Sequence, residues 1–353
     1  GYNEKLEGQI RAALGSSQMK LFSVIGNHDQ DGKALFKQKW EEAWGPTDYS
    51  FDRGNVHYVC FNNVIYYRGQ AYWQPGELTD EQLAWLESDL SLVPKSKLVV
   101  LSYHIPLTFG NRTQKGNPHA IGNGHYASTR MTRIMDLLKP FKGYELFCGH
   151  THFAVNNEIE IDGQHILEHC HAAACGDIWQ SNVNIDGVPN GYYVYEMKGN
   201  KVKDCYYKGT NWDKEKQMAL FRADTDLNGE SYAADWNLPR DSGIIVANVF
   251  NADSEWKVYA IENGKKTEMT RLQKTPCQDA FAVGYHHKYA KSNVYNFFSK
   301  KNGYLKMNHW YYYQPKDPNA FITIKVVDKY GNTYTETSDH VVTEPFYNYA
   351  HYY

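Results

Sequence analysis

Three short apolar runs of the chain are each followed by polar side chains that can bind a metal ion. The three polar clusters are Gly26-Asn27-His28-Asp29, His104 and Gly149-His150-Thr151-His152. Imidazole nitrogens and an amide oxygen together suit metal ions of borderline softness. These residue types, each placed directly after an apolar run, indicate a metal site.

The apolar runs predict strands that would bring the clusters together. They cover residues 19–25, 98–101 and 146–148. Short continuous apolar runs are typical of buried strands in parallel sheets, and ligands of an open α/β sheet bind beyond the carboxyl ends of its strands. We therefore expect the amide and the imidazoles of the three clusters to meet in one crevice. Gly26 ends the first strand and, since it has no Cβ, lets the backbone come close to another group.

Helices are expected between these strands. The spacing of apolar residues predicts them over residues 3–14, 34–44, 80–90 and 129–139. Residues 79–82 have the form of a capping box for the third helix. A β-hairpin over residues 155–167 is expected to turn at Asp162-Gly163. Residues 108–127, rich in Gly, Asn and His, are long for a plain connection and predict a lid or pocket rim.

The composition and the periodicity of the sequence change near residue 209. Residues 210–242 are polar, and short β patterns with turn signals follow them. Regular short strands without helices are typical of a β-sandwich, and a length of 353 residues favours two domains. We therefore predict an α/β domain over residues 1–208 and an all-β sandwich domain over residues 209–353.

Composition excludes several classes of partner. The formal net charge of −3 gives no electrostatic footprint for nucleic acid or a membrane surface. No apolar run approaches the length of a transmembrane segment. The six cysteines contain no C-x-x-C pair and no zinc-ribbon spacing, so we expect them to be free and buried rather than paired.

The three polar clusters, in this order along the chain, resemble the calcineurin-like metallophosphoesterases. The resemblance implies an α/β fold in which a calcineurin-like β-sandwich, here incomplete, is flanked by helices. Runs such as Tyr313-Gln314-Pro315 make the second half similar to the β-sandwich that follows the catalytic domain in phosphoesterases of Bacteroides-like bacteria. That similarity implies an exported bacterial protein of the periplasm or cell surface.

The resemblance also implies a reaction and its cofactors. Members of the family hydrolyse phosphate esters with two divalent ions, of manganese, iron or zinc, which polarise the ester and activate a bridging hydroxide. Carried over residue by residue, Asn27, His104 and His150 would bind one ion, and His152 would bind the other. The substrate would be a small-molecule, lipid or sugar phosphate ester, and no residue says which.

His28 and Asp29 would be the catalytic pair if the resemblance holds. His28 would not bind a metal ion but would lie near the phosphate or the leaving oxygen, to orient it or to donate a proton. Asp29 would hold His28 through a hydrogen bond.

Two sequence blocks of the family are missing from their usual places. No Asp-x-His occurs in the chain, and Gly176-Asp177 follows the other blocks instead of preceding them. In the family, these blocks supply the bridging carboxylate and most ligands of the second ion. Neutral imidazoles and an amide bring no negative charge, so they bind a divalent ion weakly. We therefore expect an N-terminally truncated chain that holds no ion or one weakly bound ion and is inactive or impaired.

Three further residues are weaker candidates for a substrate pocket. His169 and His171 would share one face of a strand, a spacing that metal ligands also use, but a strand with His171 near the pocket wall is the commoner arrangement. Asp177 could line the pocket and is favoured as a structural or hydrogen-bonding group. Arg112 could meet a phosphate from the predicted lid, although a solvated loop arginine is commoner.

A hypothesis of a different class is a binding module. The β-sandwich over residues 209–353 would then dock a glycan or an envelope partner, without catalysis. Phosphatase assays with added manganese test the enzyme hypothesis. Retention of residues 210–353 on polysaccharides tests the binding hypothesis.

Overall fold

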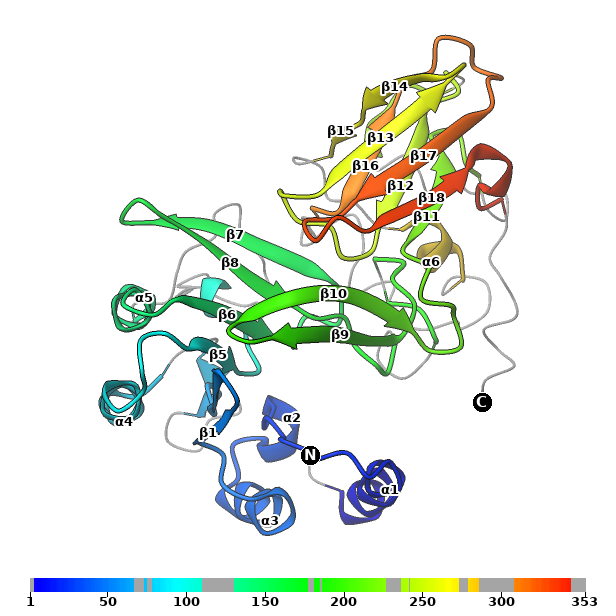
Figure 1. The fold of residues 1–353 in the computed structure, drawn as a ribbon. Coiled ribbons are helices and arrows are strands. Elements are labelled where there is room, and N and C mark those ends of the chain that lie inside the picture. The colour runs from blue at the N-terminus through cyan, green and yellow to red at the C-terminus, as the bar shows by residue number, and fades with distance from the viewer. Residues whose placement is uncertain are drawn as a thin grey trace.

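The computed structural model describes most of the chain as an α/β part and a β-sandwich part (Figure 1). The described residues are 3–66, 73–74, 78–109, 130–176, 181–184, 186–226, 236–240, 242–272, 279–285 and 308–343. The predicted fold class, α/β followed by an all-β sandwich, is confirmed. Within the described residues, no helix is long and apolar enough to cross a bilayer.

A six-stranded mixed sheet organises the α/β part. Its strands, in spatial order, are β1 (Tyr49–Arg53), β2 (Val56–Cys60), β5 (Leu98–Ser102), β6 (Gly143–Cys148), β8 (Gln164–Cys170) and β7 (Val155–Ile161). The four central strands β2, β5, β6 and β8 run parallel, and β1 and β7 are antiparallel edges. The carboxyl ends of the central strands therefore meet at one edge of the sheet, as the two later apolar runs predicted.

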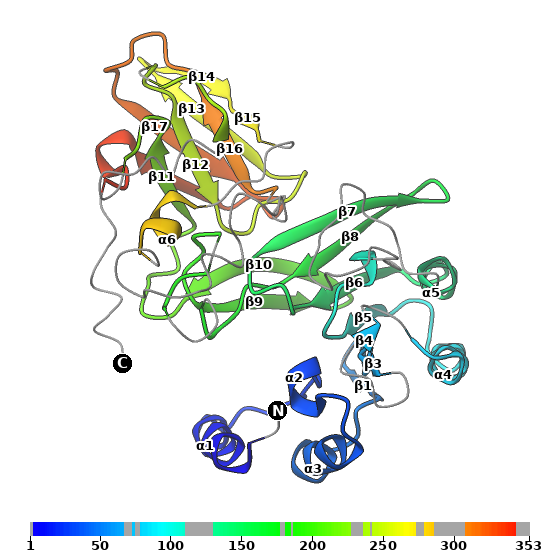
Figure 2. The same ribbon diagram turned by 180° about the vertical axis from the view of Figure 1, so that it is seen from behind.

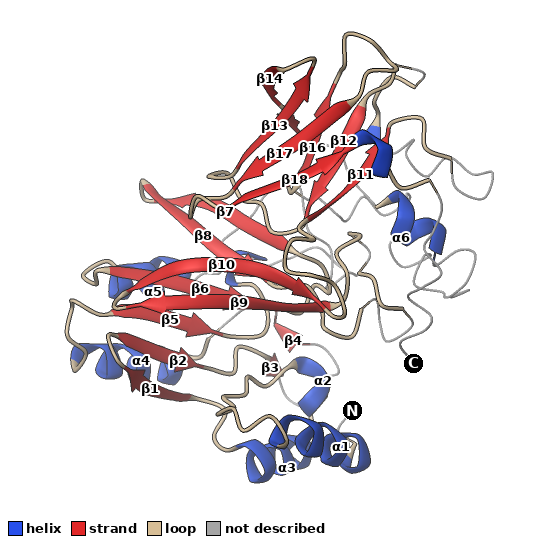
Figure 3. Cartoon of the chain, turned by 45° about the vertical axis from the view of Figure 1, so that its right-hand side comes forward, coloured by secondary structure: helices blue, strands red, loops and turns tan. Residues whose placement is uncertain are grey.

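Both faces of this sheet are covered. The helices are α1 (Glu4–Gly15), α2 (Asn27–Gln30), α3 (Ala34–Trp44), α4 (Asp80–Ser91) and α5 (Met131–Leu138). Figure 3 shows α4 and α5 on one face of the sheet and the hairpin of β9 (Gly191–Lys198) and β10 (Lys201–Gly209) on the other. Val99 and Leu101 of β5 join the core beneath the helices, whereas Leu98 and Val100 pack with residues of the hairpin. Burial on both faces explains why β5 is apolar from Leu98 to Leu101.

The predicted capping box is confirmed at the start of α4. The Thr79 hydroxyl accepts from the backbone N–H of Gln82, and the Gln82 side chain accepts from the backbone N–H of Thr79. These two bonds satisfy N–H groups that the first turn of a helix leaves unpaired. The helix then buries Leu83, Leu86 and Leu90 against the sheet.

The strand expected over residues 19–25 is wrong. Residues 18–26 are irregular, and the Met19 side chain is 69% exposed. Phe22 stacks on Phe51 of β1, with ring centroids 3.8 Å apart, and Ile25 is buried. Apolar side chains therefore bring the segment beside the edge of the sheet. It forms no backbone ladder there, and a strand requires one.

The second part is a sandwich of two antiparallel sheets (Figure 2). One sheet holds β11 (Met218–Arg222), β12 (Ile245–Val249), β16 (Trp310–Tyr313) and β15 (Thr270–Arg271). The other holds β14 (Lys265–Glu268), β13 (Lys257–Glu262), β17 (Ile322–Val327) and β18 (Thr333–Thr337). Leu220 and Ala247 of the first sheet share a core with Val258 and Ile324 of the second. The alternation of buried and exposed residues in β13 and β17 is the pattern that predicted this sandwich.

The remaining elements are short. They are β3 (Ile65–Tyr66), β4 (Trp73–Gln74), the 3₁₀ turns Leu107–Phe109 and Ser338–His340, and α6 (Ala280–Tyr285). Phe221 and Trp310, from the sandwich sequence, belong to the same buried cluster as Leu86 and Leu101. The core is thus continuous past residue 209, and the division of the chain there stays a prediction.

The remaining predictions of structure have mixed outcomes. The hairpin over residues 155–167 is confirmed as β7 and β8, and Asp162 and Gly163 both have positive φ at its turn. The buried cysteines Cys60, Cys148, Cys170 and Cys205 are free, as predicted, and Cys277 lies outside the described residues. Most of the predicted lid, residues 110–127, also lies outside them.

Candidate metal centre

The structure brings Asn27, His104 and His150 together at the carboxyl edge of the sheet. Asn27 is the first residue of α2, His104 follows β5 by two residues, and His150 follows β6 by two. β5 and β6 are neighbouring parallel strands, so the loops that follow them start side by side. The Gly149 backbone N–H donates to the His104 carbonyl over 3.0 Å and ties these two loops together. We call the three side chains the Asn27 triad.

Three potential ligand atoms of the triad lie within 3.2 Å of one another. Asn27 Oδ1 is 2.8 Å from His104 Nε2 and 3.2 Å from His150 Nδ1. The two ring nitrogens are 3.2 Å apart. If Asn27 Oδ1 accepted a proton from both rings, two N–H groups would face each other across this last contact. Hydrogen bonding within the triad therefore cannot satisfy all three contacts at once.

The triad fits three ligands of one divalent ion. At metal–ligand distances of ~2.1 Å, adjacent ligands of an octahedral ion are ~3 Å apart, and the three contacts are 2.8–3.2 Å. An ion would accept a lone pair from each ring and from the amide oxygen, which removes the conflict between ring protons. Among the described residues, no group of three or more His, Cys, Asp or Glu side chains could hold a metal ion. The triad contains two such side chains and an amide.

The backbone at Gly26 lies close to the His104 ring. A Cβ at this position would lie 3.1 Å from His104 Cε1 and 3.2 Å from His104 Nε2. The backbone φ of −106° is an ordinary value, so a residue with a Cβ would be opposed here by lack of space and not by conformation. The prediction that Gly26 admits a close neighbour is confirmed, and that neighbour is a potential metal ligand.

The loop after β6 holds two histidines in an uncommon backbone conformation. His150 has φ 71° and His152 has φ 60°, in the left-handed region that residues with a Cβ seldom adopt. Such a conformation costs on the order of 1–3 kcal/mol and is found preferentially at functional sites. Two of them within three residues are consistent with a loop shaped to present imidazoles.

The environment of His104 keeps its ring neutral. Burial lowers the pKa of His104 to about 3, and the nearby His152 and His28 add to the effect. A neutral imidazole has the free lone pair that a metal ion needs. His152 lies close enough to His104 to act on its pKa electrostatically.

The expected contact between His28 and Asp29 is wrong. Asp29 Oδ2 accepts a hydrogen bond of 2.7 Å from the Gly26 backbone N–H, so Asp29 caps its own helical turn. The carboxylate that faces His28 is Asp31, whose Oδ1 is 3.5 Å from His28 Nδ1. Asp31 ends the turn with φ 42°. The His28 side chain itself is 68% exposed beside the triad.

The weaker pocket candidates have different outcomes. His171 lies beside the end of β6, because its backbone N–H donates to the Cys148 carbonyl. Its ring stacks on Tyr193, and its Nε2 lies 2.7 Å from the Tyr195 hydroxyl. Burial lowers the pKa of His171 to about 3. Its ring thus packs against aromatic side chains of β9, and its place near a substrate pocket stays a prediction. Arg112 and Asp177 lie outside the described residues.

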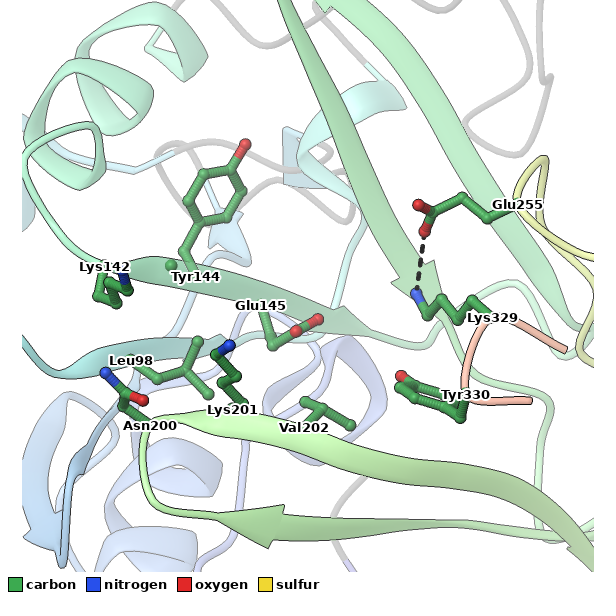
Figure 4. A pocket seen from close by; sticks show the side chains of 11 residues that line it. Leu98, Lys142, Tyr144, Glu145, Asn200, Lys201, Val202, Glu255, Lys329 and Tyr330 are labelled. Carbon is green, nitrogen blue, oxygen red and sulfur yellow. Dashed lines mark ion pairs between the residues drawn. The ribbon is translucent and has the colours of Figure 1, made fainter. Parts of the chain in front are cut away.

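A separate cavity of about 290 Å³ lies at the opposite edge of the sheet (Figure 4). Leu98 and Gly143 line it, and they are the first residues of β5 and β6, whereas the triad follows the last residues of these strands. Lys329 in this cavity pairs with Glu255 over 3.8 Å. The cavity therefore combines charges of both signs and lies about one strand length from the triad.

Sequence reasoning missed two buried polar residues that contact the segment carrying His104. They are Asn63, which follows β2, and Glu168 in β8. Both left a signal. Asn63 follows an apolar strand in the same way as the three polar clusters, and Glu168 alternates with Ile166 and Cys170 on one face of its strand. A charged residue at such a position of a buried strand has to be paired.

Comparisons with known proteins point to one class of enzyme. Residues 168–334 match a family model described as the C terminal of calcineurin-like phosphoesterase. A stretch of 146 residues is 30% identical to the glycerophosphodiester phosphodiesterase GpdQ of Enterobacter lignolyticus strain SCF1. Both matches are to phosphoesterases. They support a relation to the metallophosphoesterases at the level of the family.

The extent of these matches limits what they show. The match to GpdQ covers 40% of this chain and 48% of that protein, so the chain spans about half the length of the curated relative. The family model covers the end of β8, the hairpin of β9 and β10 and most of the sandwich, but none of the Asn27 triad. The role of the triad therefore rests on its geometry.

Proposed function

We propose that this chain serves metal-dependent hydrolysis of phosphate esters, with the Asn27 triad as the ligands of one divalent ion. The convergence of Asn27 Oδ1, His104 Nε2 and His150 Nδ1 within 3.2 Å carries the proposal. The matches to phosphoesterases support the class of reaction. The name of the matched phosphodiesterase favours a diester as the substrate.

The residues of the chain have distinct tasks in this proposal. The triad would hold the ion, which supplies Lewis-acid polarisation of a phosphate oxygen when bound. His28, exposed at the edge of the triad, would contact an ester oxygen and orient it or give it a proton. Asp31, rather than Asp29, would set the orientation of His28.

The proposed ion is held weakly. The triad contributes no negative charge, and carboxylates usually supply most of the affinity for hard divalent ions. His152 is the remaining predicted ligand of a second ion. With a single weak ion we expect slow hydrolysis.

A Co²⁺ titration followed by visible absorption tests the proposal. The wild-type chain is expected to take up one ion at a site with nitrogen and oxygen ligands, and to hydrolyse bis(p-nitrophenyl) phosphate only when the ion is present. Loss of the absorption band in His104→Ala and in His150→Ala would support the triad. Equal binding by wild type and both variants would refute it.

A further inference from the structure

Two fully buried polar side chains bind the segment that carries His104. The segment covers residues 103–108, directly after β5. Asn63 approaches it from the end of β2, and Glu168 approaches it from β8. Both side chains are 0% exposed. The mechanism proposed above uses neither of them.

Asn63 fixes the peptide groups on both sides of His104. Its Oδ1 accepts from the backbone N–H of His104 over 3.1 Å and from that of Ile105 over 3.0 Å. Its Nδ2 donates to the Ile105 carbonyl over 2.5 Å. One side chain thus satisfies three main-chain groups that follow the end of the strand and have no ladder partner there. The direction in which the His104 side chain leaves the backbone is set by these bonds.

Glu168 holds the segment on either side of the histidine. Its Oε1 accepts from the Tyr103 hydroxyl over 2.6 Å and from the Leu107 backbone N–H over 2.7 Å. Its Oε2 accepts from the Thr108 hydroxyl and from Asn157 Nδ2. The Tyr103 ring also stacks on Phe61, with centroids 5.1 Å apart. The carboxylate therefore connects the start and the end of the segment to the neighbouring strands.

Burying the carboxyl group of Glu168 costs free energy that an ordinary loop does not require. Burial raises the pKa of Glu168, against the effect of the hydrogen bonds from Thr108, Tyr103, Leu107 and Asn157. A buried carboxyl group destabilises the fold unless it is well hydrogen-bonded, and an apolar residue of similar size usually costs less. The hydrogen bonds converge on the residues that flank His104, which suggests that they fix its position.

We propose that Asn63 and Glu168 are positioning residues that hold His104 where its Nε2 meets Asn27 and His150. The inference rests on the proposed function, since it treats the triad as the metal site. Neither residue touches the ion or the substrate. Each acts through the backbone that carries His104, as outer partners of metal ligands do in other sites.

The sheet offers a matched control for a purely structural role. Asn156 of β7 is also buried, and its Nδ2 donates to the carbonyls of Asn251 and Ala252 over 3.1 Å each. Its Oδ1 lies 2.6 Å from His169 Nδ1. Asn156→Ala thus removes a buried amide with as many bonds as Asn63→Ala does, but none of these bonds goes to residues 103–108.

The experiment compares wild type, Asn63→Ala, Glu168→Gln, Asn156→Ala and His104→Ala. Co²⁺ affinity is measured by titration, and the imidazole nitrogen resonances of His104 are measured by NMR without metal. Loss of an outer partner of a metal ligand typically weakens binding about 10- to 100-fold. We expect a loss of this size in Asn63→Ala, a smaller loss in Glu168→Gln, which keeps one acceptor oxygen, and no change in Asn156→Ala. The His104 resonances should shift in the first two variants only.

The outcomes separate this inference from the proposed function. If wild type binds Co²⁺ more tightly than His104→Ala, but Asn63→Ala and Glu168→Gln bind like wild type, the triad stands and the inference is overturned. If wild type and His104→Ala bind alike, the proposed function fails, and the NMR comparison decides whether Asn63 and Glu168 still position the ring. If Asn63→Ala does not fold, Glu168→Gln decides by the same two measurements. A loss in Asn156→Ala equal to that in Asn63→Ala would mean a general effect of stability and would also overturn the inference.

Discussion

Helices α1 and α4 carry the same kind of apolar stripe, but only the stripe of α4 is buried. In α4, Leu83 and Leu86 are each 1% exposed, because the helix lies on the sheet. In α1, Leu6 is 52% and Ile10 44% exposed, and no residue of the helix is buried. Periodic apolar residues therefore predicted both helices correctly, but they did not determine whether the stripe is buried. Burial depends on whether a packed strand lies opposite.

The residues of the candidate metal centre also differ in whether they follow a strand of the sheet. His104 and His150 follow β5 and β6, whose central places in the sheet fix where their loops begin. Asn27 follows the irregular residues 18–26, and its position depends on the four-residue helix α2. The two histidines thus follow strands of the sheet, whereas Asn27 follows a segment outside it. The following predictions test this difference.

The largest expected effect concerns the two apolar stripes. Leu86→Ala removes a buried side chain beneath α4 and should lower the free energy of unfolding by about 2–5 kcal/mol. Ile10→Ala changes an exposed position of α1 and should alter it by less than about 1 kcal/mol. Urea denaturation of the two variants measures the difference. Equal losses would mean that the α1 stripe is covered in solution.

The second prediction compares two histidines of the site. His104→Ala should weaken Co²⁺ binding more than about 100-fold, because loss of an outer partner alone costs about 10- to 100-fold. His28→Ala should leave the affinity unchanged, since the His28 ring is exposed and faces Asp31. The same titration, followed by diester hydrolysis with the metal bound, distinguishes ligand from substrate contact. A drop in affinity in His28→Ala would give that residue a role in binding the ion.

The third and smallest effect concerns the close approach of Gly26 to His104. Gly26→Ala places a methyl group 3.1 Å from the ring, and the ring or the backbone must move by a few tenths of an ångström. We expect Co²⁺ affinity to fall about tenfold, comparable to the loss of an outer partner. Gly8→Ala is the control, because nothing lies within 4 Å of its new methyl group. It should keep the affinity and stabilise α1 by up to about 1 kcal/mol. An unchanged affinity in Gly26→Ala would show that the ring is not confined.

Local sequence signals predicted most elements of the fold. The capping box at Thr79, the hairpin turn at Asp162-Gly163 and the apolar run of β5 each specify their structure through nearby residues. Residues 19–25 failed because a strand also needs a paired neighbour, and an apolar run does not show whether one is present. The prediction of a strand over residues 19–25 used only the apolar composition, whereas backbone pairing decides whether a strand forms.

The part of the candidate site that follows paired strands could be predicted from the sequence. His104 and His150 converge because the order of parallel strands forces their loops together, which the strand-end rule anticipates. The bond expected between Asp29 and His28 failed because a single turn of helix, closed by the Gly26 N–H, directs Asp29 away. Asn63 and Glu168 bind a segment that is distant from them in the sequence, so their partners could be found only in the folded chain.

The measurement that tests the central claim most directly is the metal content of the wild-type chain. The chain is equilibrated with Co²⁺ and then examined by equilibrium dialysis and plasma emission, before and after a chelator. We predict one ion per chain that the chelator removes easily, because the triad supplies three uncharged ligands. No bound ion at millimolar Co²⁺, or two ions that resist the chelator, would contradict the account.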